Sequence, residues 1–592
     1  MYAIPRPEHP RPQFERDSWI NLNGEWSYEF DFGGSGRDAG RELFKSKGFG
    51  GRIVVPFCPE SELSGVGHKD FIENMWYHRR ISIPAEWAGR RVILHFGGVD
   101  YESETYIDGA SVANPHFGGS ASFELDITPF VRAGECHDLV VRVHDNTRSG
   151  DEPRGKQCCD FKSRGCSYTR TTGIWQTVWL EAVAPEGLKR VQIVPDFDGS
   201  RFIVTPSYYS VADGCRFRAT LLDGDSAVAV ADGAAIDGVP AVLQIPGEAK
   251  PWSPESPFLY GLRLEVVAPD GDVVDSVRSY AGLRKVHVEG DRFFLNNRPL
   301  YFRLVLDQGF YPDGIWTAPS DEALRRDIEL SMAAGFNGAR LHQKVFEERF
   351  HYWADRLGYL TWGESASWGC NPAKTPAARN FLPEWAEIVE RDRNHPSIVA
   401  WTPFNETWGV ASAAENREHQ RTQIDAYNLC KAIDPTRPVN DASGHIHALT
   451  DLWTTHSYSR GPQLAKEFAE GGEKGVWTPE RFKAWTCPYR GQPYILDEFG
   501  GLKWIKEGDA AFADNTWGYG NDIPDLDTLY RIIEEEVDAI LAVPNMCGWC
   551  YTQLTDVEQE QNGIYCYDRT EKFDMARIRA IFSREPKWAA AN

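Results

Sequence analysis

Two glutamates each follow a short apolar segment of the chain. Glu406 comes after Ile398–Phe404, and Glu498 comes after Tyr494–Leu496, with one polar residue before each glutamate. Paired carboxylates at one edge of a sheet suit glycoside hydrolysis, in which one protonates the leaving oxygen and the other stabilises or attacks the anomeric carbon. A single glutamate in such a place is more often a solvated loop acid or the partner of an arginine. Two of them, each beside polar and aromatic residues, predict a catalytic pair.

Other polar residues stand where predicted strands end. Arg340, at the end of Phe336–Leu341, is expected to orient Glu498 and keep it ionised, with a structural ion pair as the alternative. Tyr458 is expected to donate a hydrogen bond to Glu498. His456 is either a sugar ligand or a core histidine, and we favour the ligand. The same argument about strand ends, or about a loop that overhangs the site, predicts substrate contacts at Asp307, Gln308, Glu364, Gln553 and Asp556.

The elements that must position these residues change in type along the chain. Residues 1–185 contain short β-branched strands separated by Gly-Gly and Asp-Gly turns, which predicts a jelly-roll β-sandwich. Residues 186–282 have the strand content and length of one immunoglobulin-like β-sandwich. From residue 283 to residue 592, helices alternate with short apolar strands, beginning with a helix that Ser320 is expected to cap. This alternation predicts a (β/α)8 barrel, whose functional residues lie at the carboxyl ends of its strands.

Composition excludes several other classes of protein. The 592 residues include 63 Lys and Arg against 86 Asp and Glu, for a formal net charge of −23 at pH 7. So acidic a chain offers no dominant basic surface for nucleic acid or an anionic membrane. The first residues resemble no signal peptide, and no run approaches the ~18 apolar residues of a membrane span. We therefore expect a cytoplasmic protein whose partner is a small glycoside or oligosaccharide.

No metal or cofactor is expected. The 12 cysteines lack paired spacing, and Cys547 and Cys550 fall within a strand pattern, which favours reduced core thiols. His445 and His447 could bind a metal, but no clear third ligand accompanies them. The stretch 154–170 is basic within this acidic chain. It is expected to form a loop that reaches the mouth of the barrel or a neighbouring subunit.

Several short motifs, in order over most of the chain, resemble glycoside hydrolase family 2, the β-galactosidase and β-glucuronidase family. The residues around the two glutamates match the family's catalytic segments. The N-terminal domain and the entry to the barrel contribute the motifs Leu22–Trp26, Ile53–Pro56, Trp76–Arg80, Gly97–Asp100, Thr172–Trp175, Gly282–Lys285 and Leu295–Leu300.

The resemblance implies a retaining double displacement. Glu406 then matches the acid/base and Glu498 the nucleophile, with carboxyl groups about 5–5.5 Å apart. Asn405 matches the residue that contacts the sugar 2-hydroxyl. Trp549 falls where related enzymes commonly place an aromatic platform beneath the sugar. Because family members are often dimers or tetramers, the resemblance also implies a homo-oligomer.

The residues expected to recognise the sugar differ from the family pattern. After Arg340 the family has a histidine three residues on, whereas here Gln343 holds that place and His342 precedes it, and both are taken as substrate-binding residues. Ser167 stands where these enzymes carry a sugar-binding Asp. The Asn-x-Lys pair by which β-glucuronidases hold a uronic carboxylate is not evident after Glu498. These differences argue against a glucuronide and leave galactopyranoside, galactofuranoside and arabinoside open.

The sequence therefore predicts an exo-β-glycosidase that acts on terminal β-linked sugars, with the retaining mechanism that the resemblance implies. Two alternatives stay open. One is a carbohydrate-binding protein whose barrel has lost activity, although such a protein has no reason to keep both glutamates. The other is a transglycosidase, which uses the same covalent intermediate and differs only in the acceptor.

Overall fold

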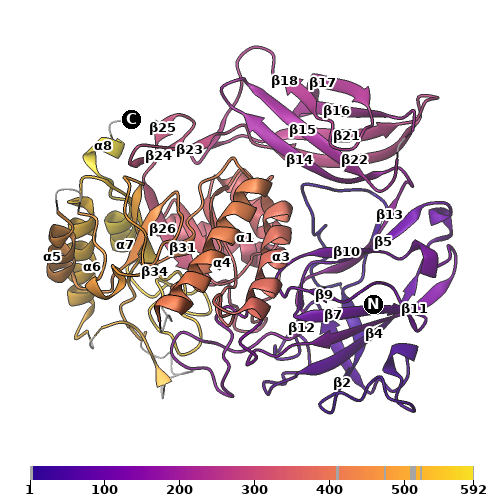
Figure 1. The fold of residues 1–592 in the computed structure, drawn as a ribbon, viewed down its shortest axis with the longest axis horizontal. Helices are drawn as coiled ribbons and strands as arrows, with labels where there is room; N and C mark the ends of the chain where they lie inside the picture. Colours follow the sequence, from indigo (N-terminus) through magenta and orange to yellow (C-terminus); the bar gives the residue numbers. More distant parts are fainter. Residues whose placement is uncertain are drawn as a thin grey trace.

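The computed structural model of the chain describes residues 4–211, 213–407, 412–472, 475–506, 515–520 and 523–590. Figure 1 shows three regions that follow one another along the sequence. An indigo β-sandwich contains the N-terminus, a magenta β-sandwich lies above it, and the orange and yellow helices and strands form the barrel at the left.

The N-terminal domain packs two antiparallel sheets face to face, as the jelly-roll prediction requires. Alternate residues of its central strands point inward, so that Leu139, Val141 and Val143 of one strand are buried in the shared core. The first sheet runs in the order β1 (Trp19–Asn21), β13 (Val178–Val183), β5 (Arg91–Phe96) and β10 (Phe123–Asp126). The second runs β3 (Gly51–Val55), β2 (Gly24–Phe30), β4 (Asn74–Ser82), β11 (Cys136–His144), β7 (Glu102–Ile107) and β8 (Ala110–Ser111).

The second domain is also a sandwich of two antiparallel sheets. Leu262, Leu264 and Val266 alternate along one strand and fill its core, which is the expected pattern for a strand with one wet face. One sheet contains β14 (Leu188–Asp196), β15 (Arg201–Tyr208) and β18 (Ala241–Gln244). The other contains β17 (Ser226–Ala234), β16 (Arg216–Asp223), β21 (Tyr260–Val267) and β22 (Val273–Ala281).

A seven-stranded parallel sheet forms most of the barrel wall. Its strands are β29 (Ile398–Thr402), β28 (Leu360–Glu364), β27 (Gly338–Leu341), β26 (Phe302–Asp307), β34 (Met546–Thr552), β33 (Tyr494–Gly500) and β32 (Trp453–His456). The gap between the two edges is spanned by β30 (Phe404–Asn405), which continues from β29 and pairs in parallel with β31 (Ala442–Ser443). The backbone N–H of Gly444 then donates to the Thr454 hydroxyl on β32. The predicted barrel class is confirmed.

Helices cover the outside of this wall. They are α1 (Asp321–Ala333), α2 (Glu348–Leu357), α3 (Thr375–Asp392), α4 (Ala413–Ile433), α5 (Gly461–Glu470), α6 (Leu526–Leu541), α7 (Met575–Phe582) and α8 (Lys587–Ala590). The hydroxyl of Ser320 accepts from the Ala323 backbone N–H and caps α1, as predicted. A small sheet of β23 (Val286–Glu289), β24 (Arg292–Leu295) and β25 (Arg298–Pro299) packs against Phe302 and Leu304. It closes the barrel at the end where β26 begins.

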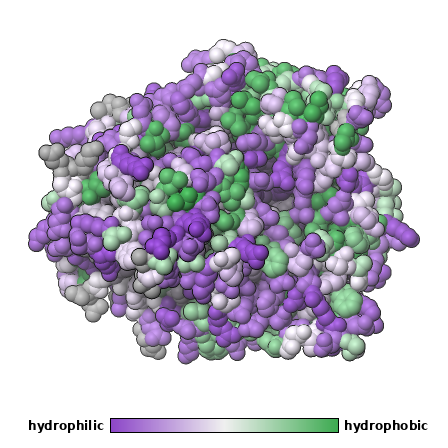
Figure 2. Space-filling view, viewed as in Figure 1, coloured by the Kyte–Doolittle hydropathy of each residue, from purple (hydrophilic) through white to green (hydrophobic). Residues whose placement is uncertain are grey.

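The visible surface is largely hydrophilic, as the charge of the chain suggests. Figure 2 shows apolar side chains gathered mainly at the upper right, over the immunoglobulin-like sandwich. None of the helices in the described part of the chain has the length and apolar character needed to cross a membrane.

Candidate active site

Glu498 lies at the carboxyl end of β33, where two neighbouring elements hold it. Arg340 at the end of β27 donates to Oε1 at 2.9 Å, and the Tyr458 hydroxyl donates to Oε2 at 2.5 Å. Burial by itself raises the pKa of Glu498, but the positive charges of His456 and Arg340 outweigh it and keep the pKa well below its ordinary value. An ionised, oriented carboxylate is what a nucleophile at an anomeric carbon requires. Arg340 and Tyr458 contact it as the sequence predicts.

Glu406 faces Glu498 from the segment that follows β30. Its backbone adopts a left-handed conformation with φ of 47°, and its N–H donates to the Ser443 carbonyl on β31 at 2.8 Å. Oxygens of Glu406 and Glu498 and a ring nitrogen of His456 all lie within 4.8 Å of one another. One oxygen of each carboxylate therefore lies close to the other group, as expected for a retaining pair, whose carboxyl groups stand ~5–5.5 Å apart.

His456 lies between the two carboxylates, which corrects the prediction that it binds sugar. Its Nδ1 is 2.8 Å from Glu406 and 3.4 Å from Glu498, and its Nε2 is 2.8 Å from the Ser443 hydroxyl. Burial lowers the pKa of His456, but Glu498 and Asp497 outweigh it and raise the pKa above its ordinary value. Since protein groups engage both ring nitrogens, His456 is a positioning residue. The sequence suggested only two roles for His456, a sugar ligand or a core histidine. It could not show these contacts, because the residues that contact His456 lie on other segments of the chain.

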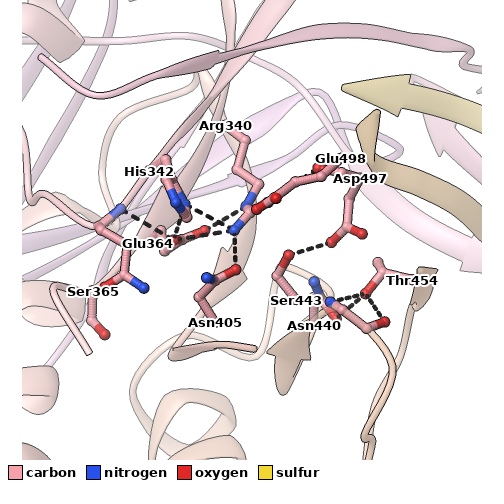
Figure 3. Close-up of polar contacts among 12 residues, drawn as sticks. Arg340, His342, Glu364, Ser365, Asn405, Asn440, Ser443, Thr454, Asp497 and Glu498 are labelled. Carbon is pink, nitrogen blue, oxygen red and sulfur yellow. Dashed lines mark hydrogen bonds and ion pairs between the residues drawn. The ribbon is translucent and has the colours of Figure 1, made fainter. Parts of the chain in front are cut away.

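Arg340 is the centre of the network in Figure 3. Besides Glu498, it donates to Glu364 at 2.6 Å, to the Asn405 side-chain oxygen at 2.6 Å and to the Asp497 carbonyl at 3.1 Å. With its donors taken by protein acceptors, the guanidinium orients the site and does not bind substrate. The Asn405 Nδ2 is buried and has no hydrogen-bond partner among the described residues, so it is available to a sugar hydroxyl as predicted.

Glu364 and His342 support Arg340, which corrects their prediction as substrate contacts. The Glu364 carboxylate accepts from Arg340, from His342 Nδ1 at 2.9 Å and from the Gln343 backbone N–H at 3.1 Å. Burial, together with the charges of Lys156 and Arg340, lowers the pKa of His342 well below its ordinary value. Gln343 differs from these two residues, because its Nε2 is buried without a partner in the described part of the chain. Contact between Gln343 and a substrate therefore stays a prediction.

Trp549 is not a platform beneath the sugar. A bulge shifts the register between β33 and β34 where Tyr494 and Ile495 pair with Met546 and Gly548. Because of this shift, Trp549 points out of the barrel and packs against Phe499 of β33 and Phe582 of α7. The prediction rested on the family resemblance, which places an aromatic platform on this strand, and the bulge turns the side chain at this position outward.

Asp307 also points out of the barrel. It shares the outward face of β26 with Val305, and its carboxylate accepts from the Gly309 N–H at 2.9 Å. Burial, and then the negative charge of Asp327 on α1, raise the pKa of Asp307 to about 7. The sequence correctly placed Asp307 at the carboxyl end of a barrel strand, but it did not show that the side chain points away from the interior of the barrel.

Asp556 and Gln553 hold the loop after β34 instead of contacting substrate. Lys572 donates to both Asp556 oxygens, at 2.6 and 2.8 Å, and both residues are buried. Gln553 accepts from Gln308 at 2.5 Å and donates to Asn562 at 2.7 Å. These contacts leave neither side chain turned toward a ligand.

The sequence analysis missed Lys156 and Glu560. Lys156 comes from the N-terminal domain, within the basic stretch 154–170, and its Nζ lies 4.0 Å from the ring centre of Trp368. That ring donates through Nε1 to the Asn405 carbonyl, so the loop does reach the barrel mouth. The basic stretch was the available signal, but the sequence could not show which of its residues enters the site.

Glu406, His456 and Glu498 also meet the distance criterion for a three-ligand cation site. Arg340 and Tyr458 already satisfy Glu498, so a cation here would compete with them and with a sugar. This donor set fits a catalytic pair better than a resident metal.

Three descriptions of one family match consecutive parts of the chain. The glycosyl hydrolases family 2 sugar binding domain matches residues 66–209, and the family 2 TIM barrel domain matches residues 286–502. A third description, glycosyl hydrolases family 2, matches residues 215–284 between them. Together these matches span most of the chain.

Curated relatives are similar at low identity. A putative β-glucuronidase of Formosa agariphila is 27% identical over 61% of this chain, which spans 44% of that relative's length. A β-glucuronidase of Paenibacillus borealis is 24% identical over 71% of this chain and 72% of its own. A β-galactosidase of Thermoanaerobacter pseudethanolicus is 25% identical over 72% of this chain and 55% of its own.

Among solved structures, the β-glucuronidase of Ruminococcus gnavus has the same fold. It superposes with a TM-score of 0.79 at 18% identity, covering 98% of this chain and 99% of its own. The consecutive family matches, the three-domain fold and the paired carboxylates at the barrel mouth agree. The chain belongs to glycoside hydrolase family 2.

Proposed function

We propose that this chain is a retaining exo-β-glycosidase in which Glu498 is the nucleophile and Glu406 the acid/base. The observation that carries the proposal is the approach of the two carboxylates within 4.8 Å, with Glu498 held by Arg340 and Tyr458. This close approach supports direct attack by Glu498 on the anomeric carbon, whereas an inverting enzyme holds its carboxyl groups ~6.5–9.5 Å apart to admit a water.

The proposed reaction has two displacements. Glu498 attacks the anomeric carbon while Glu406 gives its proton to the leaving oxygen, which forms a glycosyl ester and releases the aglycone. A water then attacks the same carbon, Glu406 takes its proton, and Glu498 leaves as a carboxylate. The free Asn405 Nδ2 is placed to donate to a sugar hydroxyl during both steps. A sugar acceptor in place of water would make the enzyme a transglycosidase.

For the glycone we propose a neutral sugar. The two cations that contact the catalytic pair are already engaged, because Arg340 is bonded to Glu364 and Glu498, and His456 lies between Glu406 and Glu498. An anionic sugar would add a carboxylate to a site crowded with carboxylates. The rival glycone is a uronide, which the names of the β-glucuronidase relatives favour.

A panel of aryl glycosides tests this proposal. It would contain pyranosides and furanosides of both anomers, neutral and uronic, assayed with wild type and Glu498→Gln. Release from one β-linked neutral glycone, lost in the variant, is the expected result, with first-formed product of retained configuration by NMR. Turnover that persists in Glu498→Gln, or product of inverted configuration, would contradict the assignment of the nucleophile.

A further inference from the structure

A loop of the N-terminal domain is anchored directly to the barrel mouth. The Arg154 N–H donates to the Trp368 carbonyl at 2.7 Å, and the Gly155 N–H donates to the Ala366 carbonyl at 3.0 Å. Gly155 has a φ of 56°, and a Cβ at this position would lie 2.1 Å from the Gln343 carbonyl oxygen. Only glycine permits this approach, which brings the next residue, Lys156, to the site.

Lys156 is a buried cation beside the sugar-facing residues. Its side chain is 6% exposed, and its Nζ lies over the ring of Trp368, whose Nε1 donates to the Asn405 carbonyl at 3.2 Å. In the described part of the chain it forms no ion pair with a carboxylate within bonding distance. Burial opposes its charge, yet Cys166, Glu560 and the catalytic carboxylates outweigh burial and raise the pKa of Lys156.

Glu560 is fixed by a closed ring of hydrogen bonds. The Tyr168 hydroxyl donates to Glu560 Oε2, and Asn562 donates to Oε1 at 2.9 Å. Gln308 donates to Tyr168 at 2.5 Å and also to Gln553 at 2.5 Å, and Gln553 closes the ring by donating to Asn562 at 2.7 Å. All five side chains are buried, so the carboxylate keeps one orientation.

The ring also ties Glu560 to the loop that carries Lys156. The Tyr168 N–H donates to the Lys156 carbonyl at 2.8 Å, while its hydroxyl reaches Glu560. The Gln559 side chain donates to the carbonyls of Gly165 and Ser167 at 2.8 and 3.0 Å. The two charged groups are therefore held in a fixed relation by contacts between the N-terminal domain and the barrel.

We propose that Lys156 and Glu560 form a recognition pair, built from two domains, that binds hydroxyl groups of the glycone, Lys156 as donor and Glu560 as acceptor. The inference rests on the proposed glycosidase function and names the residues that select a neutral sugar. A polyhydroxylated ring offers both donors and acceptors, so it satisfies both members of the pair. A uronic carboxylate would pair with Lys156 but would face Glu560 at the same time.

The test measures kcat/KM for the best neutral aryl glycoside and for the matching aryl uronide. Lys156→Met and Glu560→Gln should each lower kcat/KM on the neutral substrate by roughly 10- to 100-fold, the effect of a lost charge-assisted hydrogen bond. Glu560→Gln should at the same time raise the ratio of uronide to neutral turnover at least about tenfold, because the repelling charge is gone. The double variant should lose that gain, since it lacks the cation.

Matched controls lie on the same two loops. Lys162→Met and Glu571→Gln remove exposed side chains of the same types and should leave both rate constants unchanged. Thermal melting of each variant checks that it folds, and Glu560→Gln keeps the shape needed for the ring.

Two results would overturn the pair and leave the proposed glycosidase activity intact. One is neutral-glycoside turnover that Lys156→Met and Glu560→Gln leave unchanged. The other is a wild type that prefers the uronide and loses that preference in Lys156→Met, which would make Lys156 a carboxylate site. The proposed function fails if the wild type hydrolyses no member of the panel and the Glu498→Gln variant binds no free glycone by calorimetry. The recognition pair then fails with it.

Discussion

At the scale of single residues, the charge state of Glu498 depends on cations brought from other strands. Arg340 donates to it at 2.9 Å and lies fully buried, so solvent screens this interaction little. His456 on β32 and Tyr458, two residues later, complete the surroundings of Glu498. The nucleophile is thus kept ionised by protein charges in a place where burial alone would favour the acid form.

Arg340→Gln should therefore shift the acid limb of the kcat/KM profile to higher pH. Removing a cation that depresses the pKa of Glu498 lets that pKa rise, and the nucleophile is active only above it. We also expect kcat to fall by about 10²-fold or more, as when one electrostatic donor of an active site is removed. The measurement is a pH–rate profile, with the exposed Arg356→Gln as control. An unmoved acid limb would show that Arg340 does not set the charge of Glu498.

At the scale of elements, one glycine and one bulge decide which side chains enter the site. Gly155 permits the N-terminal loop to touch the Gln343 carbonyl, and the bulge in β34 turns Trp549 toward the helices. The buried ion pair between Lys572 and Asp556 holds the loop after β34 in place. Local backbone geometry therefore decides which side chains point into the active site.

Gly155→Ala should displace the loop and weaken activity without unfolding the protein. A methyl group at 2.1 Å from the Gln343 oxygen cannot be accommodated, and the left-handed φ adds about 1 kcal/mol of strain. We expect kcat/KM to fall about tenfold or more with a melting temperature within a few degrees of wild type. Gly165→Ala serves as control, because it has a similar φ and open space around a Cβ. Equal activities of the two variants would contradict the role of Gly155.

At the scale of the whole molecule, buried ion pairs join the domains. Arg16 pairs with Asp275 of the second sandwich at 2.8 Å and with Glu181 of the first at 3.1 Å, and all three side chains are buried. Although burial raises the pKa of Glu181, Arg16 and His95 outweigh it and lower the pKa below its ordinary value. The relative placement of the sandwiches, and with it the loop that carries Lys156, depends on such contacts.

Arg16→Met should destabilise the protein by about 3–5 kcal/mol at pH 7, because it leaves two carboxylates buried without their cation. A depressed folded-state pKa contributes stability above the unfolded value and loses it as the pH falls. The difference in melting temperature between wild type and variant should therefore shrink below the ordinary Glu pKa of 4.5. Calorimetry from pH 3 to pH 8 measures this difference, with Arg263→Met, a substitution of an exposed arginine, as the control. A difference that does not change with pH would rule out this ion pair as the cause.

The sequence by itself determined the three-domain order, the barrel and the two glutamates, because hydrophobic period and strand-end position are local properties. It also predicted that Arg340 orients Glu498 and that Tyr458 donates a hydrogen bond to it. Only the tertiary structure decided which way strand-end side chains face, since a bulge breaks the alternation of β34 and Asp307 lies with Val305 on the outward face of β26. It alone placed His456 between the carboxylates and brought Lys156 to Glu560. The hydrogen bonds that hold the loops of Lys156 and Glu560 together join residues up to 394 positions apart along the sequence, and no local pattern encodes such an approach.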